Sequence, residues 1–86
     1  MTNRKAQVKQ YIIRENTIIT PDDFGMWYVV NIGTTTATLN DTLPVPPGRE
    51  FGLDLHPDLI WDSNISVKFT GTGTNSLVFF GIIVKD

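Results

Sequence analysis

Strict alternation of apolar and polar side chains is the feature that most limits what this chain can fold into. Residues 64–70 alternate without interruption, and their apolar positions are Ile65, Val67 and Phe69. Successive side chains of a strand point to opposite faces, so a period of two predicts a strand with one buried face. Residues 50–55 repeat the pattern. Both segments are therefore predicted to cover one side of an apolar core.

Five further segments read as strands, and turn residues separate them. Asn40 and Asp41 tolerate the left-handed backbone of a tight turn and so predict a hairpin. The further segments are residues 8–15, 25–32, 36–39, 43–45 and 77–84. About seven short strands with no helix longer than a turn fit an all-β domain, either a sandwich or a barrel. We expect a small antiparallel β-sandwich, of jelly-roll or immunoglobulin-like type.

The size of the chain points to a need for outside support. Its 86 residues contain no cysteine and one histidine, which excludes disulfides, thiolate zinc sites and a cysteine nucleophile. Domains this small bury a limited core and usually need a disulfide, a metal or a partner subunit. We therefore expect a single domain over residues 8–86 that is stabilised by oligomerisation.

Basic residues gather at the start of the chain. The first 14 residues hold four of the seven basic residues and no acidic one, and the four are Arg4, Lys5, Lys9 and Arg14. We interpret residues 1–7 as a basic arm that contacts an acidic partner surface, with a solubilising tail as the alternative. Nucleic acid is the least expected partner, because the rest of the chain is acidic. No apolar run is long enough to span a membrane, and no signal peptide is visible.

Two predicted strands carry more apolar surface than one sandwich core requires. Residues 26–32 and 77–84 are apolar on both faces. Large exposed apolar patches are unusual on stable monomers, so one face of these strands is predicted to meet another chain. A short loop that covers this face is the alternative. The predicted oligomer interface consists of Met26, Tyr28, Val30, Val78, Phe80, Ile82 and Val84.

The segment around His56 holds the densest set of polar functional groups. Asp54, His56 and Asp58 would share one face of an extended strand, a spacing at which they could ligate a divalent cation. Pro57 interrupts that strand, so we expect a polar turn and no metal. Nothing in the sequence sets His56 beside a nucleophile such as Ser63. We therefore predict no catalytic residues, no cofactor and no enzymatic activity.

Aromatic residues suggest an alternative function. Trp61 and Trp27, with His56 nearby, could stack on a sugar ring if their faces were exposed. The same pattern places Trp27 in a strand with a core face, where an aromatic side chain is usually buried. A carbohydrate-binding or adhesin-type β-sandwich module is therefore the alternative to a self-associating structural protein.

Several segments together resemble a known class of proteins. The run from Trp27 to Leu39, the Pro-Gly turn before Phe51 within residues 43–51, residues 65–69 and the apolar last strand are similar to small β-sandwich virion proteins of tailed bacteriophages, of the head decoration, auxiliary capsid or fibre-base type. The resemblance implies a non-enzymatic structural protein, made in the host cytoplasm and placed on the capsid surface of the virion. It also implies a homotrimer that binds the major capsid protein or another virion protein.

Overall fold

Eight strands and no helix make up the protein in a computed structural model that describes residues 5–54 and 59–85. The strands are β1 (Lys5–Ile13), β2 (Thr17–Ile19), β3 (Phe24–Asn31), β4 (Thr36–Leu39), β5 (Leu43–Val45), β6 (Glu50–Asp54), β7 (Ile65–Thr70) and β8 (Leu77–Lys85). Within the described ranges no helix is long and apolar enough to cross a membrane. The predicted all-β class is confirmed.

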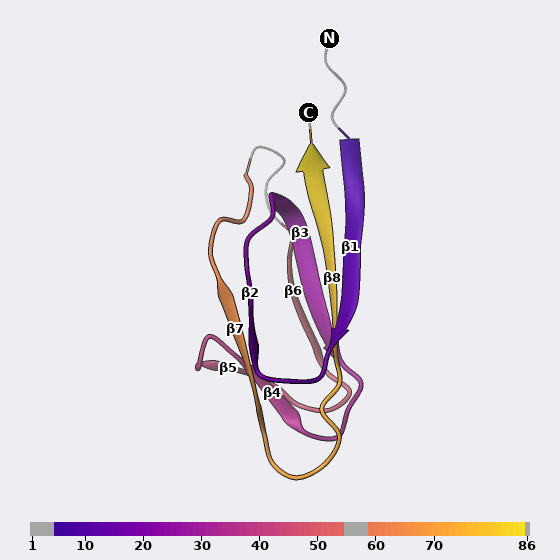
Figure 1. The fold of residues 1–86 in the computed structure, drawn as a ribbon, viewed down its shortest axis with the longest axis vertical. Helices are drawn as coiled ribbons and strands as arrows, with labels where there is room; N and C mark the ends of the chain where they lie inside the picture. The colour runs from indigo at the N-terminus through magenta and orange to yellow at the C-terminus, as the bar shows by residue number, and fades with distance from the viewer. Residues whose placement is uncertain (1–4, 55–58, 86) are drawn as a thin grey trace.

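The strands pair in an order that defines a jelly roll. The first four strands pair antiparallel with the last four in reverse order, β1 with β8, β2 with β7, β3 with β6 and β4 with β5. Two further pairings, β3 with β8 and β4 with β7, join these strand pairs into two four-stranded sheets. The sheet orders are β1-β8-β3-β6 and β2-β7-β4-β5 (Figure 1). Of the two expected sandwich types, this order is the double Greek key of the jelly roll.

Strand β2 is one strand more than the sequence analysis predicted. Residues 17–19 were expected to be part of a connection, yet they pair with β7, with Thr17 opposite Val67 and Ile19 opposite Ile65. Ile19 is buried while its two strand neighbours are exposed. A three-residue strand with one buried side chain leaves too short a pattern to be recognised from sequence.

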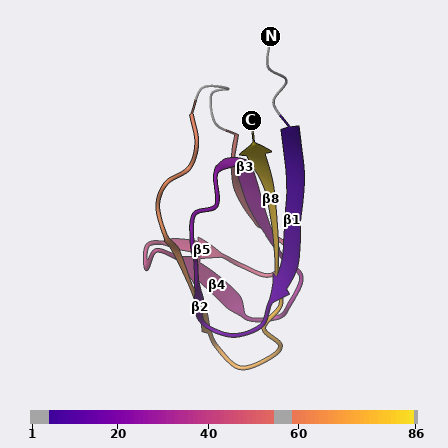
Figure 2. The same ribbon diagram turned by 45° about the horizontal axis from the view of Figure 1, so that its top comes forward.

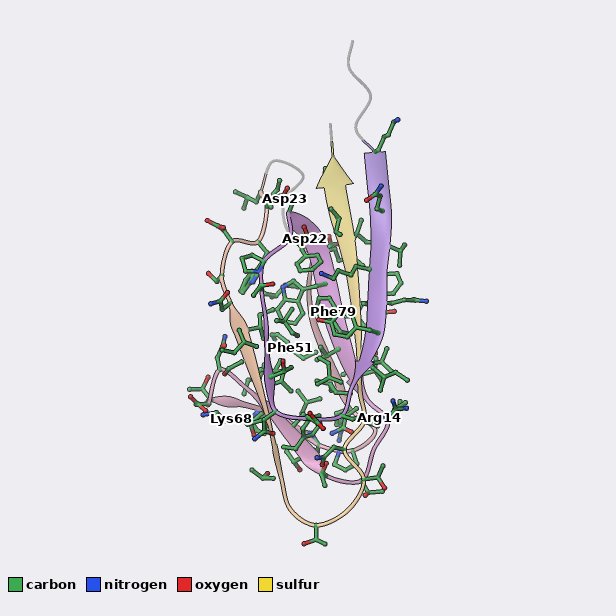
Figure 3. All side chains as sticks on the ribbon, viewed as in Figure 1. Arg14, Asp22, Asp23, Phe51, Lys68 and Phe79 are labelled. Carbon is green, nitrogen blue, oxygen red and sulfur yellow. The ribbon has the colours of Figure 1, made fainter. Side chains whose placement is uncertain are left out.

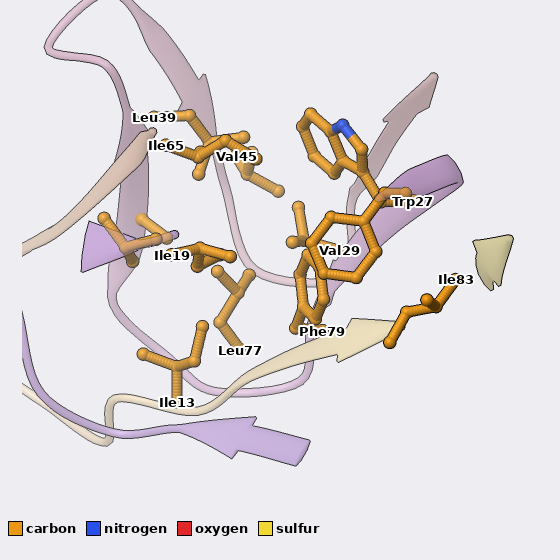
Figure 4. Close-up of a cluster of buried hydrophobic side chains, with 13 residues drawn as sticks. Ile13, Ile19, Trp27, Val29, Leu39, Val45, Ile65, Leu77, Phe79 and Ile83 are labelled. Carbon is orange, nitrogen blue, oxygen red and sulfur yellow. The ribbon is translucent and has the colours of Figure 1, made fainter. Parts of the chain in front are cut away.

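The core lies between the two sheets and consists of alternate side chains from both. Phe79 and Val29 from one sheet, and Ala37 and Val67 from the other, are all 0% exposed. Figure 4 shows the two sets of side chains meeting in one cluster. The ring of Phe79 lies 5.3 Å from that of Phe24, edge to face, a geometry that adds to the stabilisation from burial.

A buried amide ties three segments together at one end of the sandwich. Asn31 is 1% exposed, and its Nδ2 donates to the carbonyl oxygens of Thr35 at 2.7 Å and Val45 at 2.8 Å. Its Oδ1 accepts a hydrogen bond from the Gly33 N–H at 2.9 Å. All three bonds satisfy polar groups that burial would otherwise penalise. Asn31 therefore fixes the end of β3 to the start of β4 and to the end of β5.

The turn between β4 and β5 is the hairpin that the sequence predicts. Asn40 and Asp41 both have positive φ, 52° and 59°, as the two central residues of a type I′ turn require. Asn40 Oδ1 accepts a hydrogen bond from the Ser66 N–H at 3.0 Å, and Asp41 lies 2.8 Å from the ammonium group of Lys68. These contacts attach the turn to β7.

The first strand includes part of the segment that was interpreted as an arm. β1 begins at Lys5, and Lys5 to Ile13 pair in continuous register with Lys85 to Leu77 of β8. Residues 5–7 of the expected arm therefore lie in the sheet. In Figure 1 and Figure 2, β1 runs beside β8 as the edge strand of its sheet.

Candidate interaction surface

The side of the β1-β8-β3-β6 sheet that faces away from the core is apolar over three of its four strands. Register places Tyr28 opposite Phe80 and Val30 opposite Val78, and it places Val8 opposite Ile82. We call this side the outer face, and it consists of Ala6, Val8, Gln10 and Ile12 of β1, Val78, Phe80, Ile82 and Val84 of β8, Met26, Tyr28 and Val30 of β3, and Glu50, Gly52 and Asp54 of β6. All seven residues of the predicted oligomer interface lie on it.

Exposure on the outer face is greatest on the two edge strands, β1 and β6. The seven predicted interface residues are half-buried, since neighbouring side chains on the same sheet cover one another. On the edge strand, Val8 is 58% and Ile12 43% exposed. The β2-β7-β4-β5 sheet packs on the opposite side (Figure 2), and none of the described strands covers the outer face. The apolar side chains thus remain open to solvent in the single chain.

The outward side of the other sheet has a contrasting composition. It carries Thr36, Thr38, Pro44, Ile18, Ser66, Lys68 and Thr70. Lys68 lies on this side (Figure 3). It is exposed and pairs with Asp41. A face rich in threonine, serine and lysine is the usual solvent-exposed side of an antiparallel sheet. The apolar composition is therefore specific to one of the two outward sides.

Two stacked rings form the centre of the outer face. The ring centroids of Tyr28 and Phe80 are 5.1 Å apart and their planes differ by 26°. Tyr28 and Phe80 are directly opposite each other on neighbouring strands. Their rings project from the sheet and stack face to face. We call residues that lie opposite one another across the four strands a row. In the row of Tyr28 and Phe80, the residue on the edge strand β6 is Gly52, which has no side chain.

A groove beside Tyr28 follows from this glycine. It has a volume of about 630 Å³ and is lined by Tyr28, Val30, Glu50, Phe51 and Gly52. A Cβ atom on Gly52 would collide with the Cβ of Tyr28, so the close approach of the two strands requires glycine here. The groove combines an aromatic wall with the carboxylate of Glu50.

The basic residues of the N-terminal segment do not form one patch in the described part of the chain. Lys5 begins β1 and Arg14 follows its end, so about 30 Å of extended strand separates them. Figure 3 shows Arg14 near the turn that follows β1. Lys9 points away from the outer face and lies 3.5 Å from Asp22 Oδ2. Arg4 lies outside the described residues. If these residues contact a capsid or another partner, as predicted, they do so at separate points and not as one basic patch.

The aromatic residues considered for sugar stacking lie in and beside the core. Trp27 is 2% exposed in the core, so neither face of its ring is open to a ligand. Trp61 packs edge-on against Trp27 at a centroid distance of 5.6 Å, and its Nε1 donates to the Ser63 carbonyl oxygen at 2.6 Å. His56 lies outside the described residues. Trp61 thus closes one end of the core, as a partly buried side chain.

Metal ligands do not gather in the described ranges. Asp54 stands at the end of β6 on the outer face, while His56 and Asp58 fall outside the described residues. Among residues 5–54 and 59–85, no three His, Cys, Asp or Glu side chains lie close enough to hold a metal ion. The prediction that the chain binds no metal stays a prediction.

Some members of the outer face were missed by sequence analysis. Val8, Gln10 and Ile12 alternate in sequence, but only the register with β8 shows that this side of β1 extends the surface of Val78 and Ile82. Gly52 gives no sequence signal that distinguishes it from a turn glycine. The interface was therefore predicted on two strands, and the structure extends the apolar area to a third.

Comparison with known proteins adds no assignment to this surface. No protein-family model matches the chain, and no curated protein matches it at a significant level. The likeness to small virion proteins of tailed phages therefore remains a resemblance, carried by the residues quoted above.

Proposed function

We propose that this protein is a non-enzymatic structural subunit that self-associates through the outer face of the β1-β8-β3-β6 sheet. In the form that the resemblance implies, it is an accessory protein of a tailed-phage virion, of the capsid decoration or auxiliary type. It would bind the major capsid protein or another virion protein on the capsid surface. The homotrimer is the oligomer that the resemblance implies.

The observation that carries this proposal is the contrast between the two outward sides of the sandwich. The β2-β7-β4-β5 side is polar, whereas the outer face presents aromatic and aliphatic side chains in every row. Three apolar strands about 4.8 Å apart, over about eight residues of about 3.3 Å each, give roughly 400 Å² of apolar sheet. An apolar patch of this extent is as large as the largest patch on a typical soluble monomer, and such patches are often functional.

The fold supports the proposal by analogy only. Jelly rolls occur in viral capsid proteins and in lectins, and a fold by itself does not determine a function. Of these two uses, the lectin-like one loses support from the burial of Trp27, which leaves one fewer ring to stack on a sugar. The apolar outer face favours a subunit of an assembly.

Self-association is testable on the pure protein. Multi-angle light scattering at micromolar concentration should give a mass of at least two chains. Phe80→Arg, which places a charge at the centre of the outer face, should give monomers with an unchanged circular dichroism spectrum. Thr38→Arg is the matched control, because it places the same charge on the polar side of the sandwich and should leave the mass unchanged. A monomeric native protein would refute self-association.

The virion role needs a separate experiment. Quantitative mass spectrometry of purified particles should find the chain at a copy number comparable with that of the major capsid protein. Its absence from particles of a genome that encodes it would contradict the virion role and would leave the self-association result standing.

A further inference from the structure

The two edge strands of the β1-β8-β3-β6 sheet differ in the charge that they carry on the outer face. The edge strand β6 carries Glu50 and Asp54 on the outer face, each two residues from Gly52. The opposite edge strand, β1, has only uncharged side chains on that face, and Arg14 follows it directly. The apolar area therefore has an acidic border on β6 and an uncharged border on β1, and Arg14 and then Glu15 follow β1 in the sequence.

We infer that two copies pack their outer faces together about a two-fold axis parallel to the strands, so that β1 of each copy lies over β6 of the other. This inference rests on the proposed self-association and specifies its geometry. Two sheets that pack face to face keep their strands nearly aligned at about 10 Å. A two-fold axis that relates aligned faces runs either along the strands or across them, and these two choices place different edges in contact.

Charge distinguishes the two axes. An axis across the strands would lay β6 over β6 of the second copy and set Glu50 against the second copy's Asp54. Like charges placed together at an interface are unfavourable. An axis along the strands instead sets the acidic border of one copy over β1 of the other. Arg14 lies two residues beyond the row of Glu50, about 7 Å along the strand, within reach of a long side chain.

Shape favours the same axis. Residues of one row face each other when the axis runs along the strands, so Gln10 of one copy lies over Gly52 of the other. The groove of about 630 Å³ beside Tyr28 would then receive a side chain whose amide can donate to Glu50. With the axis across the strands, the two grooves would face each other empty. Charge and shape thus select one arrangement independently.

Charge exchange tests this geometry, because the two axes predict opposite signs. Glu50→Arg and Arg14→Glu should each raise the dissociation constant of the dimer about five- to tenfold, by placing like charges together. The double variant should return it to within about threefold of the native value. Tighter association of Glu50→Arg, or no rescue in the double variant, would overturn the inferred axis. Sedimentation velocity measures each constant, and circular dichroism confirms folding.

Crosslinking gives a second measurement that does not depend on charge. The chain has no cysteine, so Ile12→Cys and Glu50→Cys each introduce a single thiol, in the same row at opposite edges of the sheet. With the axis along the strands, a short bis-maleimide reagent should join the two variants when mixed and should join neither variant to itself. Crosslinks within one variant, or none in the mixture, would contradict this axis.

The results separate the inference from the proposal on which it rests. A monomeric native protein refutes both. An oligomer that Phe80→Arg dissociates, but that the charge and crosslinking experiments show in another orientation, refutes the inferred axis alone. A native mass of three chains also refutes the two-fold pair and supports the trimer implied by the resemblance.

Discussion

Asn31→Asp replaces one amino group by an oxygen at the most highly connected polar site of the core. The native Nδ2 donates to two carbonyl oxygens, those of Thr35 and Val45, at 2.7 and 2.8 Å. A carboxylate has no proton to donate, so both buried carbonyls would lose their donor and face a negative charge. The side chain keeps its shape, and the change tests hydrogen bonding rather than packing.

The expected loss is large for a domain of this size. Each buried carbonyl left without a partner costs about 1–3 kcal/mol, so two of them give about 2–6 kcal/mol. The whole domain is expected to have a free energy of unfolding of about 4–13 kcal/mol. We predict that Asn31→Asp lowers it by about 4 kcal/mol at pH 7. Urea unfolding followed by tryptophan fluorescence, at one chain concentration for all variants, measures the difference.

Acid should reverse part of this loss. Burial beside two carbonyl oxygens raises the pKa of the introduced carboxyl group in the folded state above its unfolded value of about 3.9. The penalty is therefore complete above the folded pKa and shrinks as pH falls through it, because the folded chain then takes up a proton. A protonated carboxyl can also donate to one of the two carbonyls. The deficit relative to the native protein should be smaller at pH 4 than at pH 7.

Asn40→Asp is the matched control. Asn40 is exposed, and its Oδ1 only accepts, from the Ser66 N–H, so a carboxylate can replace it. This variant should differ from the native protein by less than about 0.5 kcal/mol. The reasoning would be refuted by a loss below about 1 kcal/mol for Asn31→Asp, by equal losses in the two variants, or by a deficit that does not change with pH.

Three further outcomes are expected. Phe79→Ala, which empties a core site that is 0% exposed, should cost about 3–5 kcal/mol of unfolding free energy in urea, whereas Phe80→Ala on the outer face should cost less and mainly weaken association. Gly81→Ala should lower the melting temperature by about 10 °C, because its Cβ would lie 2.6 Å from Cε1 of Phe24; an unchanged melting temperature would contradict the close packing. Burial raises the pKa of Tyr11, so the unfolded chain releases this proton first and stability should fall as pH rises above about 10. Tyr11→Phe should remove that part of the alkaline loss, measured by unfolding at pH 9 and pH 11.

Alternation was sufficient to locate β6 and β7, because burial of one face of a strand leaves a direct record in sequence. Val67 is 0% exposed and Lys68 beside it is exposed, as the period of two predicts. Strand pairing leaves no such record in the sequence. Alternation indicates which side chains of a strand share a face, but it does not indicate which strand lies next to it. The jelly-roll and immunoglobulin-like orders therefore stayed open until the pairing of β1 with β8 and of β2 with β7 was known.

The residues of the candidate surface could be predicted from the sequence, but the side of the sheet on which they lie could not. Apolar residues on both faces of β3 and β8 indicated surplus surface, and the chosen set, Tyr28 and Phe80 among them, lies together on one side. That this side faces outward depends on Phe79 and Trp27 filling the core, which requires the curvature and register of both sheets. Trp27 illustrates the limit, because its neighbours allowed it to be either a core residue or an exposed ring.

Charge gives the clearest case of a sequence property that changes meaning on folding. Along the chain, the basic start and the acidic remainder suggested an arm and a body. In the jelly roll the first strand and the sixth occupy opposite edges of one sheet, so a difference along the sequence becomes a difference across a surface. A copy rotated about the strands brings these two edges together, and a copy rotated across them brings like edges together. Arg14, one of the four cations at the basic start of the chain, can therefore specify the orientation of a partner on the outer face.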